Sequence, residues 1–71
     1  MVNQMVLSRE IEWIGYEEKS GMLQVEFIAG GIYQYDNVPQ NIYDDFLNAE
    51  SHGRYLEEHI KGKYSYRKIR S

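Results

Sequence analysis

Apolar and polar residues alternate along parts of the first half of the chain, and this pattern predicts β-strands. Between residues 22 and 28 the apolar side chains that share one face are Leu23, Val25 and Phe27. Two glycines, Gly30 and Gly31, separate this run from a second alternating run at residues 32–36. Two alternating runs around a Gly-Gly pair predict a β-hairpin.

A further strand is predicted upstream, at residues 11–16. Its apolar positions change phase at Gly15, which indicates a bulge or a close backbone approach. A polar turn at residues 17–21 joins this strand to the hairpin. Residues 1–9 precede the first predicted strand, and we treat them as a segment that could be flexible.

The spacing of apolar residues becomes helical after residue 38. Pro39 suits the first turn of a helix, where its missing N–H is not needed, and we predict this helix over residues 39–49. Ser51 is suited to cap a second helix that reaches about residue 60, with Gly62 as the glycine that ends it. The apolar stripes are Ile42, Tyr43, Phe46 and Leu47 in the first helix, and Tyr55, Leu56, His59 and Ile60 in the second.

The last residues, 63–71, alternate without a helix breaker and predict an extended tail, which would be an edge strand if it pairs with the sheet. The order of elements predicts an α+β fold. We expect a small antiparallel sheet of three strands, or four if the tail joins it, followed by two short helices packed on one face. A length of 71 residues is that of one domain.

Composition argues against several kinds of catalytic site. The chain has no cysteine, which removes disulfides, thiolate metal sites and thiol nucleophiles. His52 and His59 are seven residues apart, too far to clamp one metal ion in the manner of an i, i+4 pair. Asp44 and Asp45 point to different sides of a helix and make a poor acid–base pair. We therefore predict a protein that is not an enzyme, with no catalytic residue, metal or cofactor and no evident small-molecule substrate.

The N-terminal residues also bear on location. They lack the basic segment and apolar run of a signal peptide. No stretch of the chain approaches the roughly 18 apolar residues that a membrane span requires. These two observations predict a cytoplasmic protein that does not insert into a membrane.

Charge is divided unevenly along the chain. Residues 1–60 carry a net charge of −8, whereas residues 61–71 carry +5. This basic tail interleaves cations with aromatic rings: Lys61, Lys63, Tyr64, Tyr66, Arg67, Lys68 and Arg70. Such interleaving suits a single-stranded nucleic acid, because cations bind phosphates and bases stack on tyrosine rings. Alternatively, the tail folds back onto the acidic body, or it is an edge strand that docks a protein partner or a second copy.

Three further residues belong to the candidate nucleic-acid site. Tyr33 and Tyr35 lie two positions apart, so they project from the same face of the hairpin. They are either core residues under the helices or a stacking platform on an open face, depending on the hairpin register. Arg54 opens the second helix, where a cation needs an anionic partner. That partner is either a phosphate or one of the nearby acids, namely Asp44, Asp45 and Glu50.

An ordered set of short motifs runs from about residue 10 to residue 70. Its pieces are Ile14-Gly15-Tyr16, Val25-Glu26-Phe27, Gly31-Ile32-Tyr33-Gln34-Tyr35, Val38-Pro39, Ile42-Tyr43, Ser51-His52-Gly53-Arg54-Tyr55-Leu56, His59-Ile60 and Lys63-Tyr64-Ser65-Tyr66-Arg67. The set resembles the KTSC domain family, a module at the C-terminus of some lysyl-tRNA synthetases that also occurs as a free-standing small protein. The resemblance implies one KTSC-like domain over residues 1–71, and RNA binding has been suggested for the family from its synthetase context.

Two hypotheses of function follow. The first is a non-enzymatic binding module that binds RNA through its basic, tyrosine-bearing tail. The second is a protein-interaction or homo-oligomeric module that does not bind nucleic acid. The sequence does not identify the ligand, the partner, the oligomeric state or the biological process.

Overall fold

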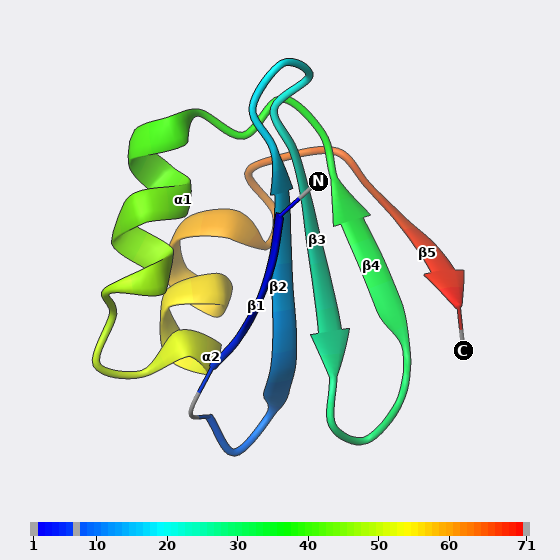
Figure 1. Ribbon diagram of the computed structural model, residues 1–71, viewed down its shortest axis with the longest axis vertical. Coiled ribbons are helices and arrows are strands. Elements are labelled where there is room, and N and C mark those ends of the chain that lie inside the picture. The colour runs from blue at the N-terminus through cyan, green and yellow to red at the C-terminus, as the bar shows by residue number, and fades with distance from the viewer. Residues whose placement is uncertain (1, 7, 71) are drawn as a thin grey trace.

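The computed structural model describes residues 2–6 and 8–70, which form an antiparallel sheet with helices on one face (Figure 1). The strands are β1 (Val2–Met5), β2 (Ile11–Glu17), β3 (Met22–Phe27), β4 (Ile32–Tyr35) and β5 (Tyr66–Arg70), and they lie in this order across the sheet. The helices are α1 (Gln40–Leu47) and α2 (His52–Tyr55), and α2 continues directly into the π-helix η1 (Leu56–Ile60).

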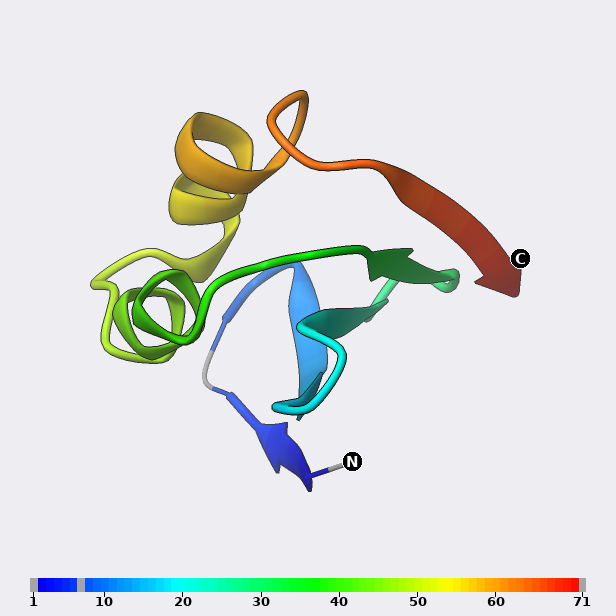
Figure 2. The same ribbon diagram turned by 90° about the horizontal axis from the view of Figure 1, so that it is seen from above.

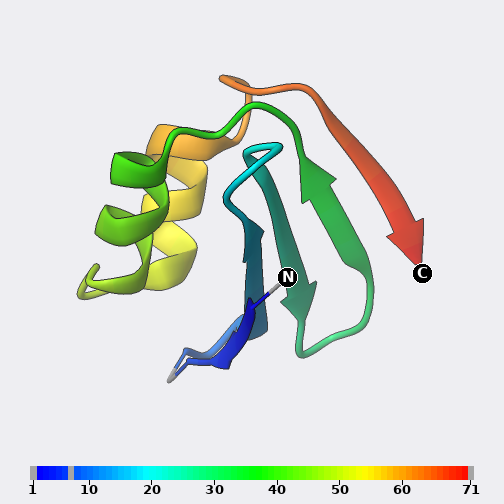
Figure 3. The ribbon, with the colours of Figure 1, turned by 45° about the horizontal axis from the view of Figure 1, so that its top comes forward.

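The predicted α+β class is confirmed, but the sheet has five strands rather than three or four. The tail supplies one of the extra strands, β5, which pairs with β4 at the edge of the sheet. The other is β1, which pairs with β2 and comes from residues in which the sequence indicated no element. Figures 2 and 3 show that the helices cover one face of the sheet and that β5 extends beyond them.

The register of the hairpin resolves which face carries its tyrosines. Residues opposite one another in neighbouring strands project to the same side. Leu23 lies opposite both Tyr16 and Tyr35, and Val25 lies opposite Tyr33. Both hairpin tyrosines therefore share the helix-covered face with the apolar residues of β3.

The core lies between this face and the helices. Its buried side chains are Ile11, Ile14, Tyr16, Leu23, Val25, Tyr35, Val38, Tyr43, Phe46, Leu56 and Ile60. The Tyr16 side chain adds a polar contact to the core, because its hydroxyl donates to the Val38 carbonyl at 2.6 Å. Its ring also stacks on Tyr43, with 4.3 Å between the ring centroids. These contacts join β2 to the segment that leads into α1.

The expected bulge lies elsewhere in β2. The register shifts between Ile11 and Trp13, whereas Gly15 is regularly paired with both Asn3 and Gln24. An extra residue before Trp13 has a clear use. Ile11 and Ile14 are three positions apart and would face opposite sides of a regular strand, but the bulge allows both to be buried. The prediction of a bulge at Gly15 was therefore wrong.

The hairpin turn follows the prediction. Gly30 and Gly31 have φ values of 108° and 99°, which a residue with a Cβ rarely adopts. The turn is closed by the Phe27 N–H, which donates to the Gly31 carbonyl at 3.0 Å.

The first helix is shorter than predicted, since it begins after Pro39 and ends at Leu47. Its expected stripe is confirmed: Tyr43 and Phe46 are buried, while Ile42 and Leu47 are half-buried. Asp44 and Asp45 are exposed on the opposite face.

The second helix begins and ends as predicted but changes type along its length. The Ser51 hydroxyl accepts a hydrogen bond from the Arg54 N–H at 3.3 Å, and Gly62 follows the helix with a φ of 78°. From Leu56 the backbone is a π-helix, in which the Lys61 N–H donates to the Leu56 carbonyl at 2.8 Å. The placement of His59 in the apolar stripe was wrong. A π-turn takes more residues than an α-turn, and His59 is exposed beside Tyr55.

Within the described part of the chain, no helix has both the length and the apolar character needed to cross a membrane.

Candidate nucleic-acid interface

An aromatic patch lies where the sheet extends beyond the helices. We define the aromatic patch as Phe27, Tyr33, Tyr35 and Tyr66, which come from β3, β4 and β5. The ring centroids of Phe27 and Tyr33 are 5.5 Å apart, and Tyr66 lies 5.8 Å from Tyr33 and 5.7 Å from Tyr35. The strand register causes this clustering, because Tyr66 is opposite Tyr35 in the sheet. The sheet thus joins the tail tyrosine to the hairpin tyrosines.

Exposure differs across the aromatic patch. Tyr66 is 58% exposed and Tyr33 is half-buried, so both rings can be reached from solvent. Tyr35 is only 1% exposed, so for this residue the core interpretation is correct. Tyr64 is half-buried against the core and precedes β5. Tyr33, Tyr64 and Tyr66 thus keep accessible ring surface, and of these Tyr33 and Tyr66 lie in the aromatic patch.

Burial also changes the acidity of Tyr35. It raises the pKa of the hydroxyl to about 12, with smaller contributions from Tyr33, Tyr66 and Glu57. The hydroxyl therefore keeps its proton, and its ability to donate a hydrogen bond, to a higher pH than an exposed tyrosine does. Burial also raises the pKa values of Tyr16, Tyr43 and Tyr55.

These shifts predict a loss of stability in alkali. The pKa of Tyr35 is higher in the folded state than the value near 10 of an unfolded chain, so the folded state holds this proton more tightly. The resulting stability is complete below about pH 10 and is lost as the pH rises towards about 12. We expect urea unfolding to show this decline, and Tyr35→Phe to reduce it. Tyr66→Phe, at an exposed position, is the control, and an unchanged decline in Tyr35→Phe would contradict the prediction.

Lys68 lies over the aromatic patch, whereas Arg67 is paired with Gln34 and projects from the other face of the sheet. The Lys68 Nζ lies 5.7 Å from the centroid of the Tyr33 ring, which is within the range of a cation–π contact. Arg67 lies opposite Gln34 and contacts Asp36, with 3.5 Å between Nη2 and Oδ1. The side chains of Lys63 and Arg70 are exposed and have no ion pair among the described residues.

Folding back onto the acidic body therefore accounts for only part of the tail charge. Besides Arg67, Lys61 forms an ion pair, with 3.1 Å between its Nζ and Oε1 of Glu57. Both pairs are at exposed positions, where an ion pair contributes little and can exchange for another anion. A phosphate could replace either carboxylate.

Arg54 lies apart from the other predicted residues. It forms an ion pair with Glu58 one turn along the same helix, with 3.3 Å between Nε and Oε2. The expected internal pair is thus present, but its partner is not Asp44, Asp45 or Glu50. The views in Figures 1 and 2 place α2 and β5 on different sides of the fold. The structure does not bring Arg54 to the aromatic patch.

A cleft that the sequence did not predict adjoins the aromatic patch. It has a volume of about 470 Å³ and lies between the hairpin turn, the start of β2 and the end of η1. Phe27, Tyr33 and Tyr35 line it together with Arg9, Glu10 and Lys61. These residues come from three distant parts of the sequence, so no local motif could have revealed the cleft.

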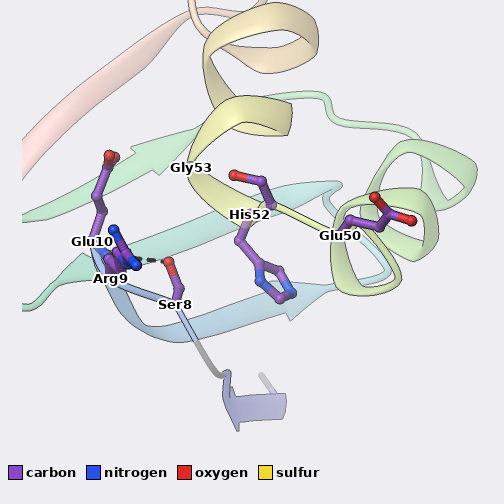
Figure 4. A pocket seen from close by; sticks show the side chains of 7 residues that line it. Ser8, Arg9, Glu10, Glu50, His52 and Gly53 are labelled. Carbon is purple, nitrogen blue, oxygen red and sulfur yellow. Dashed lines mark hydrogen bonds between the residues drawn. The ribbon is translucent and has the colours of Figure 1, made fainter.

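A second, smaller hollow of about 260 Å³ lies at the start of α2 (Figure 4). Ser8 accepts hydrogen bonds from the backbone N–H groups of Glu10 and Ile11, both at 3.2 Å. Nε2 of His52 lies 3.3 Å from the Leu47 carbonyl, while its Nδ1 is buried and has no hydrogen-bond partner among the residues that the structure describes. Figure 4 shows the Glu10 carboxylate and the His52 ring pointing in different directions, so they do not form an acid–base pair.

Gly53 allows Glu10 to approach α2 closely. A Cβ at this position would lie 2.7 Å from Oε2 of Glu10, too close for an ordinary contact. The residues around this hollow therefore serve to join the start of β2 to the helix. Among residues 2–6 and 8–70, no group of three or more His, Asp or Glu side chains could hold a metal ion.

Comparison with known proteins places this arrangement in a family. The family model for the KTSC domain matches residues 7–64 of the chain. The chain belongs to the KTSC domain family. A crystal structure of a KTSC domain protein from Yersinia pestis is similar throughout, with a TM-score of 0.92, 41% identity and 96% of each chain covered. The KTSC domain is a small domain with no known catalytic role.

Some curated relatives of this KTSC domain are about as long as the chain, and others are much longer proteins that match it over one segment. A protein of Tsukamurella paurometabola is 38% identical over 61 residues, which cover 86% of this chain and 91% of that protein. A lysine–tRNA ligase of Nostoc punctiforme is 36% identical over 59 residues, or 83% of this chain and 10% of the ligase. The chain thus spans about a tenth of the length of the ligases it matches.

Proposed function

We propose that this KTSC domain is a non-enzymatic module that binds single-stranded RNA at the edge formed by β4 and β5. The observation that carries the proposal is the continuous surface in which Tyr66 adjoins Tyr33 and Lys68 lies over the Tyr33 ring. An RNA strand bound along this edge would place its bases on the tyrosine rings and its phosphates beside the cations.

Charge supports the same location. β5 contains Arg67, Lys68 and Arg70 and no acidic residue, although the chain as a whole is acidic. The local positive charge attracts an anionic ligand to β5, whereas the acidic remainder of the protein repels it. The relatives add a reason to consider RNA, since those that contain a segment like this chain are named lysine–tRNA ligases.

Titration of a labelled single-stranded RNA and of tRNA would test the proposal. We expect a dissociation constant below about 100 μM at low salt, which is the range of non-specific nucleic-acid binding at a basic surface. If about four phosphates are contacted, the log–log plot of affinity against salt should have a slope near −3. Binding that is absent below about 100 μM, or that does not respond to salt, would show that the edge is not an RNA site.

A second candidate is self-association or protein binding through β5, because the strand is an edge and Ile69 is 47% exposed. Pairing two copies through β5 would bring the basic side chains of both strands together, which disfavours a symmetric dimer. Light scattering over a range of concentrations separates the two functions. A dimer that forms without RNA and persists in high salt would favour this second candidate.

A further inference from the structure

The cleft beside the aromatic patch has the features of a ligand site. Its volume of about 470 Å³ lies within the usual range for small-molecule pockets, and most of its lining is apolar. Phe27 and Tyr33 form two of its walls, with their ring planes at 88° to one another. A planar group that lies flat on one of these rings would meet the other edge-to-face, and both geometries are favourable.

The charged side chains of the cleft suit a ligand with an anionic part. Arg9 comes from the segment before β2 and Lys61 from the end of η1, and both are exposed. Glu10 is the one acid among the described residues that line the cleft, and its carboxylate, which lies near Gly53, can accept hydrogen bonds. The lining thus combines two cations, a hydrogen-bond acceptor and two accessible aromatic walls.

The π-helix determines where one of these cations lies. The bond from the Lys61 N–H to the Leu56 carbonyl ends the helix with a wide turn. Leu56 and Ile60 on this turn are buried, so it is anchored to the core. π-Turns are often found at functional sites. Here the π-turn ends at Lys61, which lines the cleft.

We propose that this cleft binds one nucleotide of the RNA strand, with its base against Phe27 and Tyr33 and its phosphate between Arg9 and Lys61. Glu10 accepts a hydrogen bond from an amino group of the base or from a ribose hydroxyl. The inference rests on the proposed RNA function and adds to it a defined subsite. The remainder of the strand continues from the cleft along Tyr66 and β5.

The subsite can be tested with its smallest ligand. Adenosine monophosphate, adenosine and inorganic phosphate would each be titrated into ¹⁵N-labelled protein and followed by NMR. We expect the monophosphate to bind most tightly and to shift the amide signals of residues 9–10, 27–33 and 61. Adenosine and phosphate should each bind more weakly, because each provides only one half of the interaction.

Two variants address the two halves of the subsite. Phe27→Leu retains apolar volume but removes the aromatic plane, and it should weaken binding of the monophosphate about tenfold. Lys61→Gln should weaken binding of the monophosphate and leave binding of adenosine unchanged. Arg54→Gln removes an exposed cation from α2, outside the cleft, and is the matched control. A thermal melt of each variant would establish that it is folded.

The outcomes separate this inference from the proposed function. If RNA binds but the monophosphate does not, and Phe27→Leu leaves RNA affinity unchanged, the subsite is wrong and the RNA function stands. If the wild-type protein does not bind RNA, both are overturned. Signal shifts at the cleft together with a loss in Phe27→Leu and Lys61→Gln, but not in Arg54→Gln, would support the subsite.

Discussion

Phe46→Ala is expected to unfold much of the protein at room temperature. Phe46 is fully buried between the sheet and the helices, and its ring stacks on Tyr55 at 5.7 Å. Truncation of a buried phenylalanine to alanine costs about 3–5 kcal/mol. A domain of 71 residues has a total stability of about 4–10 kcal/mol, so the loss is comparable with the whole. Circular dichroism with urea denaturation would measure it.

Two controls show whether the effect comes from packing. Phe46→Leu leaves a smaller cavity and should retain a cooperative transition, with a loss of about 1–2 kcal/mol. Met5→Ala changes a side chain that is 66% exposed, and its effect should remain within about 0.5 kcal/mol. A Phe46→Ala protein as stable as Met5→Ala would show that α1 does not close the core as described.

Removal of two charges from β5 should reduce RNA affinity strongly. Lys68 and Arg70 have no ion pair among the described residues, so the double variant Lys68→Gln/Arg70→Gln should leave the fold intact. If both side chains bind phosphates, the log–log salt slope should fall from about −3 to about −1.4. We expect an affinity about tenfold lower at low salt, measured by fluorescence anisotropy with single-stranded RNA.

The chain provides a matched control for net charge. Lys19 and Arg54 are exposed cations away from β5, in the turn between β2 and β3 and on α2. The double variant Lys19→Gln/Arg54→Gln changes the net charge by the same amount. It should retain most of the affinity and nearly the same salt slope. Equal losses in the two double variants would mean that RNA responds to total charge and that β5 is not a defined site.

The elements that the sequence predicts correctly are those that a local pattern determines. Alternation around Gly30 and Gly31 was sufficient to predict the hairpin, because the two glycines permit its positive-φ turn. Ser51 and Gly62 marked the two ends of the second helix through their caps. Each of these features depends on residues within a few positions of one another.

The features that were missed depend on partners that are distant or on subtle geometry. β1 is a short segment that becomes a strand because the edge of β2 is available to it. The sequence does not predict the π-helix, because the spacing of Leu56 and Ile60, four residues apart, also fits an α-helix. The exposure of Tyr33 and Tyr35 depended on the strand register and on how far the helices extend over the sheet. No pattern in the sequence specifies either of these.

The positions of β1 and β5 at opposite edges of the sheet affect how this domain can be joined to other chains. Four strand spacings separate them, or about 19 Å along the sheet. Because every neighbouring pair is antiparallel, β1 and β5 run in the same direction, and a linker from the end of β5 to the start of β1 must cross the sheet and also run back along it. A linker that closes the chain into a circular permutant must therefore contain more than the roughly six extended residues that span 19 Å. A fusion before β1 leaves the basic edge open. A fusion directly after β5 places the added polypeptide beside Arg70, where it would compete with any ligand for the same surface.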